Sequence, residues 1–110
     1  DGRSALSASL SHMPKFIDRL LTKAQLAIDE IDLVVPHQAS GMSLAMMQRR
    51  FELSDSRIVN YFADIGNQIA ASIPNALDTA LKAGRIKRGD KIMLVGTSAG
   101  ISLGAIILEY

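Results

Sequence analysis

Apolar positions recur along the chain with two different periods, which together predict an α/β domain. Residues 5–10 place three apolar side chains on one face at a spacing of two, and this spacing predicts a strand. From about residue 13 to residue 25 the apolar positions recur every three or four residues, which predicts an amphipathic helix. Ser11 or His12 would precede its first turn, where Pro14 is well placed.

A short β-branched run predicts the next strand and also its end. Residues 33–35 are Leu-Val-Val, and Pro36 stops the run because proline has a fixed φ and no backbone N–H. His37 is therefore expected at the carboxyl end of a strand. The pattern from Ser40 to about Phe51 then predicts a second helix, with Ser40 as its N-cap.

The middle of the chain predicts a brief strand at residues 58–59, a loop at residues 63–67 and then a long helix. Gly84 supplies the left-handed conformation that commonly follows the end of a helix. Pro74 lies within this helical span, and a proline removes a backbone donor. Either the helix kinks at Pro74, or its regular part begins near this residue with Ser72 as the cap.

The chain is uncharged from residue 92 to residue 108. These seventeen residues contain glycines at a spacing of four, a spacing that also occurs in paired membrane helices. However, the run is short for a bilayer, and small residues occupy its centre. Residues 92–95 and 105–108 are apolar on either side of this centre, so we interpret the run as a β-hairpin.

The predicted order of elements is typical of a layered α/β domain. Strands and helices alternate until the final hairpin, which gives a five-stranded mixed sheet with helices packed on its faces and the last two strands antiparallel. Loops beyond the carboxyl ends of parallel strands commonly carry binding groups. His37, Asn67 and the turn around Ser98 all fall in such loops, so these three loops are expected to converge on one edge.

Composition narrows the classes of function. The 110 residues are 48% apolar and 21% charged, which is enough for one packed core. A net charge of +1 argues against a protein that coats nucleic acid. A basic cluster interspersed with acidic residues is expected to be a solvated face: Lys82, Arg85, Lys87, Arg88 and Lys91. Residues 1–4 form no apolar signal segment, which predicts a cytoplasmic protein or a fragment, with no membrane partner.

Three places could carry chemistry, and each also has a purely structural explanation. His37 beside a helix start would favour neutral imidazole, but it could also be a core or capping histidine. Asn67 after Gly66 could be a turn or N-cap residue. Residues 96–100 could form a tight turn or let backbone amides approach a ligand. With no cysteine and only two histidines, the chain offers no thiol nucleophile and little support for a metal site.

Three motifs taken together resemble the C-terminal half of β-ketoacyl-acyl-carrier-protein synthase III, an enzyme of the thiolase fold. They are residues 32–39 (Asp-Leu-Val-Val-Pro-His-Gln-Ala), 66–74 (Gly-Asn-Gln-Ile-Ala-Ala-Ser-Ile-Pro) and 84–90 (Gly-Arg-Ile-Lys-Arg-Gly-Asp). The resemblance covers nearly the whole chain. Residues 1–110 are therefore identified as the C-terminal domain of such an enzyme, without its cysteine-bearing N-terminal half.

The resemblance implies an acyltransferase of fatty acid biosynthesis that condenses an acyl-CoA with malonyl on acyl carrier protein in a decarboxylative Claisen reaction. Enzymes of this family use a Cys-His-Asn triad, and the matching positions here are His37 and Asn67. Both would donate hydrogen bonds to the thioester carbonyl of the malonyl substrate. Substrate contacts are expected from four further residues, Gln38, Ser98, Ala99 and Gly100.

The resemblance also implies partners. They are the N-terminal half, coenzyme A thioesters and acyl carrier protein, with the thioesters as substrates and no cofactor. Arg49 and Arg50 match a basic pair that docks the acidic carrier protein, whereas an arginine expected near the start of that helix is Met42 here. Ser40 stands where an asparagine would contact the pantetheine arm.

Other functions stay open. The chain could belong to relatives that move acyl groups to other acceptors, or to coenzyme A-only condensing enzymes of secondary metabolism. A non-catalytic dimerisation domain is the alternative from a different class. Without the cysteine-bearing half, the chain alone is expected to be inactive. It is also expected to expose the apolar surface where that half packs, which predicts self-association in solution. A homodimer is expected for the enzyme that contains this domain.

Overall fold

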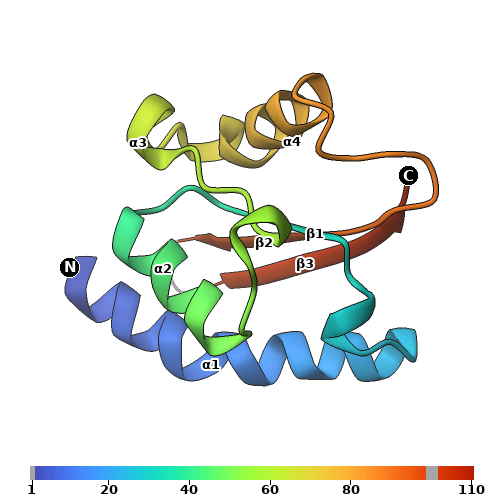
Figure 1. The fold of residues 1–110 in the computed structure, drawn as a ribbon. Helices are drawn as coiled ribbons and strands as arrows, with labels where there is room; N and C mark the ends of the chain where they lie inside the picture. Colours follow the sequence, from blue (N-terminus) through green and yellow to red (C-terminus); the bar gives the residue numbers. More distant parts are fainter. Residues whose placement is uncertain (1, 99–101) are drawn as a thin grey trace.

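A three-stranded sheet lies between helices in the computed structural model, which describes residues 2–98 and 102–110 and the side chains of residues 11–97 and 102–110. The long helix α1 (Gly2–Ala24) runs below the sheet, and α4 (Ser72–Lys82) covers the opposite face (Figure 1). The α/β class and the layered arrangement predicted from the sequence are confirmed.

The sheet has the strand order β1-β2-β3. Strand β1 (Leu33–Pro36) pairs parallel with β2 (Lys91–Ser98), which pairs antiparallel with β3 (Ser102–Glu109). The predicted hairpin is therefore confirmed. No helix in the described part of the chain combines the length and apolar character needed to cross a membrane.

Alternate residues of β1 separate two apolar cores. Val34 faces the core beneath the sheet, whereas Leu33 and Val35 face the core on the α4 side, as expected for a strand that is buried on both faces. The buried residues beneath the sheet are Met13, Ile17, Leu21, Ile31, Val34, Phe51, Leu53, Ile58, Met93 and Val95. Those on the other side are Leu33, Val35, Val59, Ala76, Ala80, Ile86 and Ile92.

The strand predicted at residues 5–10 is wrong, because this segment is the start of α1. In the sequence, Leu6, Leu10, Met13 and Ile17 recur every three or four residues, which is the period of one face of a helix. The segment contains alanine and leucine, which favour helices, and no β-branched residue. The helix predicted from about residue 13 is confirmed as part of α1. Pro14 lies inside this helix and not near its first turn.

The second predicted helix and its N-cap are confirmed. Helix α2 (Gly41–Arg50) begins after Ser40, whose Oγ accepts a hydrogen bond from the Ser43 N–H at 3.0 Å. This bond satisfies one of the backbone donors that the first helical turn leaves without a partner. Three single turns of 3-10 helix, Ile28–Glu30, Asp55–Arg57 and Ile69–Ala71, connect the longer elements.

The region predicted as a loop before the long helix contains a short helix, α3 (Phe62–Ile65). The regular part of α4 begins at Ser72, so Pro74 occupies its first turn, where its missing N–H costs little. The second of the two alternatives for Pro74 is thus correct. Ser72 is nevertheless the first helical residue and not the cap, and its Oγ accepts from the Gln68 N–H at 3.0 Å.

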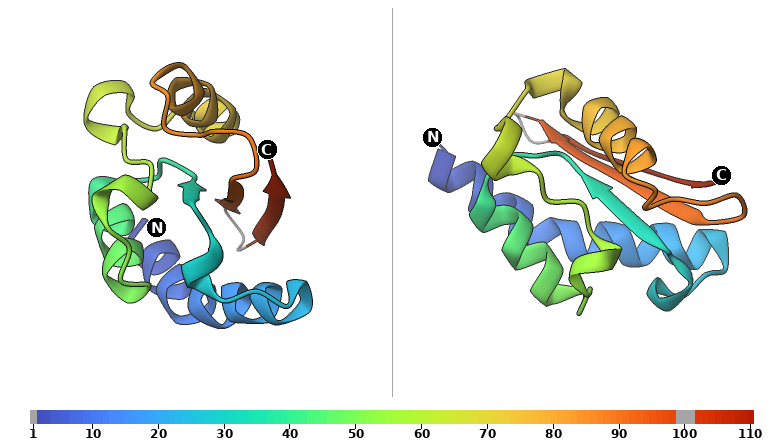
Figure 2. Two further views of the ribbon diagram at one scale, coloured as in Figure 1. Left: turned by 45° about the vertical axis from the view of Figure 1, so that its right-hand side comes forward. Right: turned by 45° about the horizontal axis from the view of Figure 1, so that its top comes forward.

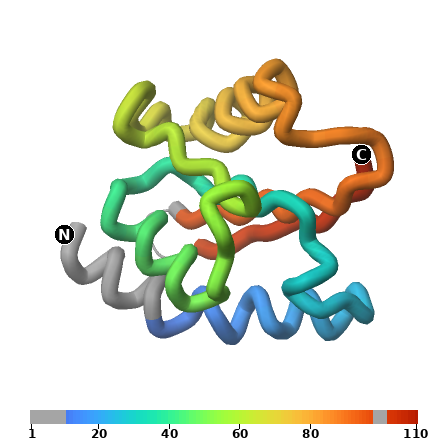
Figure 3. Tube along the Cα trace, viewed as in Figure 1, coloured from blue at the N-terminus to red at the C-terminus, as the bar shows by residue number. Residues whose placement is uncertain are grey.

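Residues 58–59 do not form the separate strand that the sequence predicted. They run beside β1 in the tube trace (Figure 3) and make one parallel bridge, between Val34 and Ile58. Side chains, not another strand, bind the next backbone groups: Arg85 binds the Ile58 oxygen and Gln38 binds the Val59 oxygen. Together with the helical residues 5–10, this reduces the predicted five strands to three in the described residues.

Gly84 ends α4 with a left-handed backbone, as predicted. Its φ is +74°, its N–H bonds to the Leu81 oxygen at 3.1 Å, and the Arg85 N–H bonds to the Ala80 oxygen at 3.0 Å. These two bonds form a Schellman motif.

Replacing Gly84 with alanine is expected to lower the free energy of unfolding by about 1–2 kcal/mol, because a Cβ disfavours the left-handed conformation. Urea unfolding followed by circular dichroism measures the change. Gly41→Ala is the matched control, since this glycine begins α2 without a positive φ and a Cβ there would meet no atom within 4 Å. Equal stability of both variants would contradict the prediction.

Candidate active site

His37 leaves the sheet immediately after β1. Its backbone N–H donates to the Val95 oxygen at 2.8 Å, which extends the β1–β2 ladder by one residue and fixes the backbone from which the imidazole extends. The side chain is half-buried, and no hydrogen bond or ion pair to its ring occurs among the described residues. Desolvation lowers the pKa of His37 below its ordinary value, so the ring is neutral at pH 7.

Asn67 lies in a turn that fixes the direction of its side chain. It follows Gly66, whose φ of +65° and ψ of −167° are essentially restricted to glycine. The Asn67 Oδ1 accepts hydrogen bonds from the Ile69 N–H at 2.8 Å and from the Ser72 Oγ at 3.5 Å. Because a backbone N–H needs an acceptor, the oxygen points inward and the Nδ2 points away from this turn. The Nδ2 has no hydrogen-bond partner among the described residues, and the side chain is exposed.

The sequence-predicted loops lie at one end of the molecule. The start of α2, helix α3 and the carboxyl end of β2 are all on the left in Figure 1, and the right-hand view of Figure 2 agrees. The first turn of α4 reaches β2 there, because the Ile73 Cδ1 lies 3.4 Å from the position that a Cβ on Gly96 would occupy. Ser98 ends β2, whereas Ala99 and Gly100 lie outside the described residues.

Gln38 is fully buried at 0% exposure. Its Nε2 donates to the Pro36 oxygen at 2.9 Å and to the Val59 oxygen at 3.2 Å, and its Oε1 accepts from the Tyr61 N–H at 2.8 Å. Substrate contact by Gln38 stays a prediction, and the burial of the side chain argues against it.

The residues expected to dock a carrier protein lie on α2. Arg49 is exposed, and Arg50 lies 3.9 Å from Asp18 and over the ring of Phe51. Met42, which replaces the expected arginine, is 64% exposed. The Ser40 hydroxyl already serves as the N-cap of α2.

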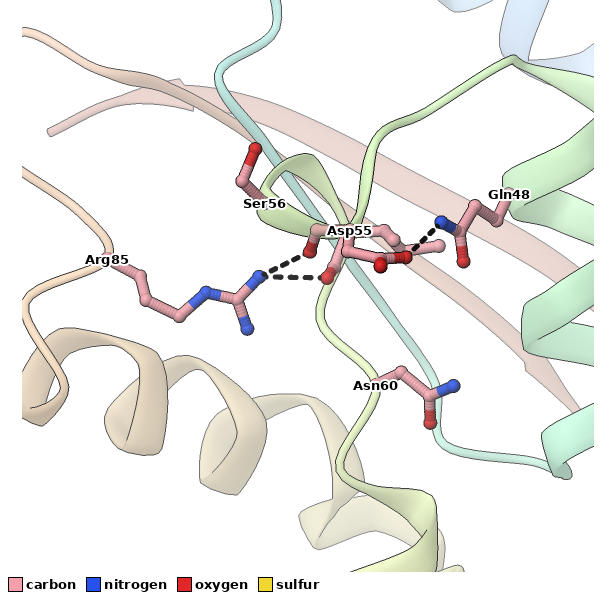
Figure 4. A pocket seen from close by; sticks show the side chains of 6 residues that line it. Gln48, Asp55, Ser56, Asn60 and Arg85 are labelled. Atoms are coloured by element: carbon pink, nitrogen blue, oxygen red, sulfur yellow. Dashed lines mark hydrogen bonds between the residues drawn. The ribbon is translucent and has the colours of Figure 1, made fainter.

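Arg85 has a role that the sequence did not reveal. Within the basic cluster it was expected to be solvated, but its guanidinium is partly buried and donates to the backbone oxygens of Asp55 at 3.1 Å and Ile58 at 2.9 Å. The two bonds close one side of an open polar pocket (Figure 4). The pocket is lined by Gln48, Asp55, Ser56, Ile58, Asn60 and Arg85. No group of three or more potential metal ligands occurs among the residues that the structure describes.

The comparison with protein families decides the identity of the domain. Residues 21–110 match the family described as 3-oxoacyl-[acyl-carrier-protein (ACP)] synthase III C terminal. The chain belongs to this family. The resemblance inferred from the three sequence motifs, to the C-terminal domain of synthase III, is therefore confirmed.

Known synthase III proteins match the whole chain. The β-ketoacyl-[acyl-carrier-protein] synthase III of Neisseria meningitidis is 36% identical over 110 residues, which are 100% of this chain and 34% of that protein. The synthase III of Synechocystis is also 36% identical, and the chain covers 33% of it. The chain thus spans about a third of the length of these relatives.

Solved structures agree with the synthase III assignment. The crystal structure of the Aquifex aeolicus synthase III superposes with a TM-score of 0.94 at 32% identity, covering 100% of this chain and 36% of that one. OleA of Xanthomonas campestris superposes with a TM-score of 0.93 at 26% identity, covering 100% and 32%. The fold of this synthase III domain is therefore shared with enzymes about three times its length.

Because desolvation lowers the pKa of His37, an NMR titration of the imidazole is expected to have its midpoint below the ordinary value of 6.5. Between that midpoint and pH 6.5 the unfolded chain binds more protons than the folded one. Stability should therefore rise with pH through this window and become constant above it. His37→Ala should remove this contribution from the pH dependence of urea unfolding. A midpoint at or above 6.5 would contradict the assignment of a neutral ring.

Proposed function

We propose that this domain supplies the histidine and the asparagine of a Cys-His-Asn triad in a decarboxylative Claisen condensation. His37 and Asn67 donate hydrogen bonds to the thioester oxygen of a malonyl substrate and stabilise the negative charge that develops as carbon dioxide leaves. The carbanion attacks the acyl group on the cysteine, a carbon–carbon bond forms, and the thiolate departs.

The proposal is supported by a histidine whose pKa is lowered by desolvation and by a carboxamide whose oxygen is already bound. Desolvation keeps the His37 ring neutral, so one ring nitrogen can donate without bringing a positive charge that must be balanced. The Asn67 oxygen is held by the Ile69 N–H, which leaves the Nδ2 as the group available to a substrate. Neither residue belongs to a buried core.

The rest of the proposed enzyme must provide the nucleophile. This chain has no cysteine, and its synthase III relatives are about three times its length. We therefore propose that the domain works together with a cysteine-bearing N-terminal half; its coverage of only 36% of the Aquifex aeolicus synthase III supports a larger enzyme. The 110 residues alone should not condense thioesters.

Removing either donor is expected to slow malonyl decarboxylation by roughly 10²–10³-fold, the usual effect of losing one oxyanion-hole donor. The variants are His37→Ala and Asn67→Asp, made in an enzyme that contains this domain and the cysteine-bearing half. Asn67→Asp is chosen because an aspartate still accepts from the Ile69 N–H but has no Nδ2 donor. Release of labelled carbon dioxide from a malonyl thioester gives the rate.

His12→Ala is the matched control, because this second histidine is exposed on α1. It should decarboxylate malonyl thioester at the rate of the unsubstituted enzyme. A purely structural dimerisation domain makes the opposite prediction for His37→Ala, namely unchanged turnover in a folded protein. That result would exclude the proposed function.

The extender substrate is proposed to arrive on acyl carrier protein, which docks at the exposed Arg49 of α2. Charge reversal by Arg49→Glu is expected to raise the KM for the malonyl carrier protein by about three- to tenfold at low salt and to leave the KM for malonyl-CoA unchanged. Lys15→Glu, on the exposed side of α1, is the control. Equal effects of Arg49→Glu on both substrates would favour the coenzyme A-only alternative.

A further inference from the structure

The position of Gln38 follows from the way in which β1 ends. On the edge of β1 opposite β2, Val34 bridges Ile58, and the Val59 N–H donates to the Val34 oxygen at 2.9 Å. Two residues further along this parallel ladder, Pro36 would face Asn60. The next two bonds would run from the residue 36 N–H to the Val59 oxygen and from the Tyr61 N–H to the Pro36 oxygen.

Proline cannot make the first of these bonds, because it has no N–H. The carboxamide of Gln38 makes both of them in its place. Its Nε2 donates to the Val59 oxygen, and its Oε1 accepts from the Tyr61 N–H. A second hydrogen on the Nε2 binds the Pro36 oxygen at 2.9 Å. The side-chain amide thus stands between the two segments as a substitute peptide group.

This substitution joins the two segments that carry the site. Gln38 follows His37 directly, and Tyr61 immediately precedes α3, whose C-cap Gly66 comes just before Asn67. The far side of the same segment is held by Arg85, whose Nη1 donates to the Tyr61 hydroxyl at 3.1 Å. Movement of α3 relative to β1 therefore requires the Gln38 bonds to break in a site from which water is excluded.

We propose that Gln38 is a positioning residue, whose carboxamide fixes the His37 turn and the Asn67 loop relative to each other. It reaches no substrate itself. The effect of Gln38 on catalysis rests on the function proposed above. The hydrogen-bonded link that Gln38 makes between the two loops does not depend on that function. The link is therefore tested first, in the 110-residue chain and without an activity assay.

The test compares Gln38→Leu with the unsubstituted chain by NMR-detected amide hydrogen exchange. Leucine fills similar space but makes none of the three bonds. The Tyr61 and Ile69 amides should each exchange at least about tenfold faster, since the buried hydrogen bonds that hold α3 against β1 are lost. The Met93 amide in the centre of the sheet should keep its protection. Unchanged exchange at Tyr61 and Ile69 would overturn the proposal.

Gln48→Leu is the matched control. Its Nε2 donates to the Asp55 Oδ1 at 2.7 Å, so this variant also loses a glutamine hydrogen bond to the same stretch of chain. Gln48 does not touch the His37 turn, and the Tyr61 and Ile69 amides should exchange as in the unsubstituted chain. If these amides exchanged equally fast in both variants, the loss of any hydrogen bond to this stretch of chain would loosen α3. That result would also overturn the proposal.

A measurement on the unsubstituted chain covers the case in which Gln38→Leu does not fold. The Gln38 side-chain amide and the Tyr61 backbone amide should then share one protection factor, because they become exposed in the same opening event. Rapid exchange of the side-chain amide beside a protected Tyr61 would show that the link does not exist.

The enzyme assay separates the two proposals. In an enzyme that contains this domain, Gln38→Met is expected to lower kcat by about tenfold or more with less than about a twofold change in the KM for malonyl thioester, because misplacement of the donors weakens only the transition state. If His37→Ala does not slow the reaction while the Gln38 variants still loosen α3, the proposed function fails and the link remains. If kcat falls without any loosening of α3, the positioning role fails.

Discussion

The placement of β1 between two parallel neighbours is the constraint on which the site depends. All four residues of this strand are buried, with β2 on one edge and the segment around Ile58 on the other. Pro36 ends the strand abruptly because it cannot donate to the second ladder. The chain therefore leaves the sheet at His37, whose backbone is still held by Val95. The short, fully buried strand β1 therefore fixes the backbone position from which the imidazole extends.

Local sequence signals correctly predicted those elements whose residue pattern is compatible with only one backbone structure. The β-branched run before Pro36, the Ser40 cap and the glycine after α4 each satisfy a specific backbone requirement, and each was placed correctly. Residues 5–10 were misassigned because a spacing of two includes a spacing of four, which also fits a helix. The helix is distinguished from the strand only because the spacing of three and four residues continues to Ile17, which lies in the core beneath the sheet.

The residues that support the candidate site were harder to predict than the candidates themselves. Motif spacing predicted His37 and Asn67 as candidates, and the elements next to them, the start of α2 and helix α3, lie at one end of the molecule (Figure 1). Gln38 and Arg85 were not identifiable as supports, because both bind backbone oxygens more than twenty residues away in sequence. Contacts between residues so far apart produce no periodic pattern in the sequence. For this reason the buried Gln38 was expected to contact substrate, and the partly buried Arg85 was expected to be solvated.

The Asn67 turn shows why these supports matter. Ile69 has a φ of +55° although it is β-branched, and it is 79% exposed, so burial of its side chain does not compensate for its unfavourable backbone. The turn persists because the Asn67 oxygen binds its N–H, and because the fully buried Ser72 binds Asn67 in turn. Those bonds orient the carboxamide, but they do not place it relative to His37. The proposed positioning role of Gln38 supplies this placement from the Tyr61 end of the segment, where the carboxamide completes the ladder that Pro36 interrupts.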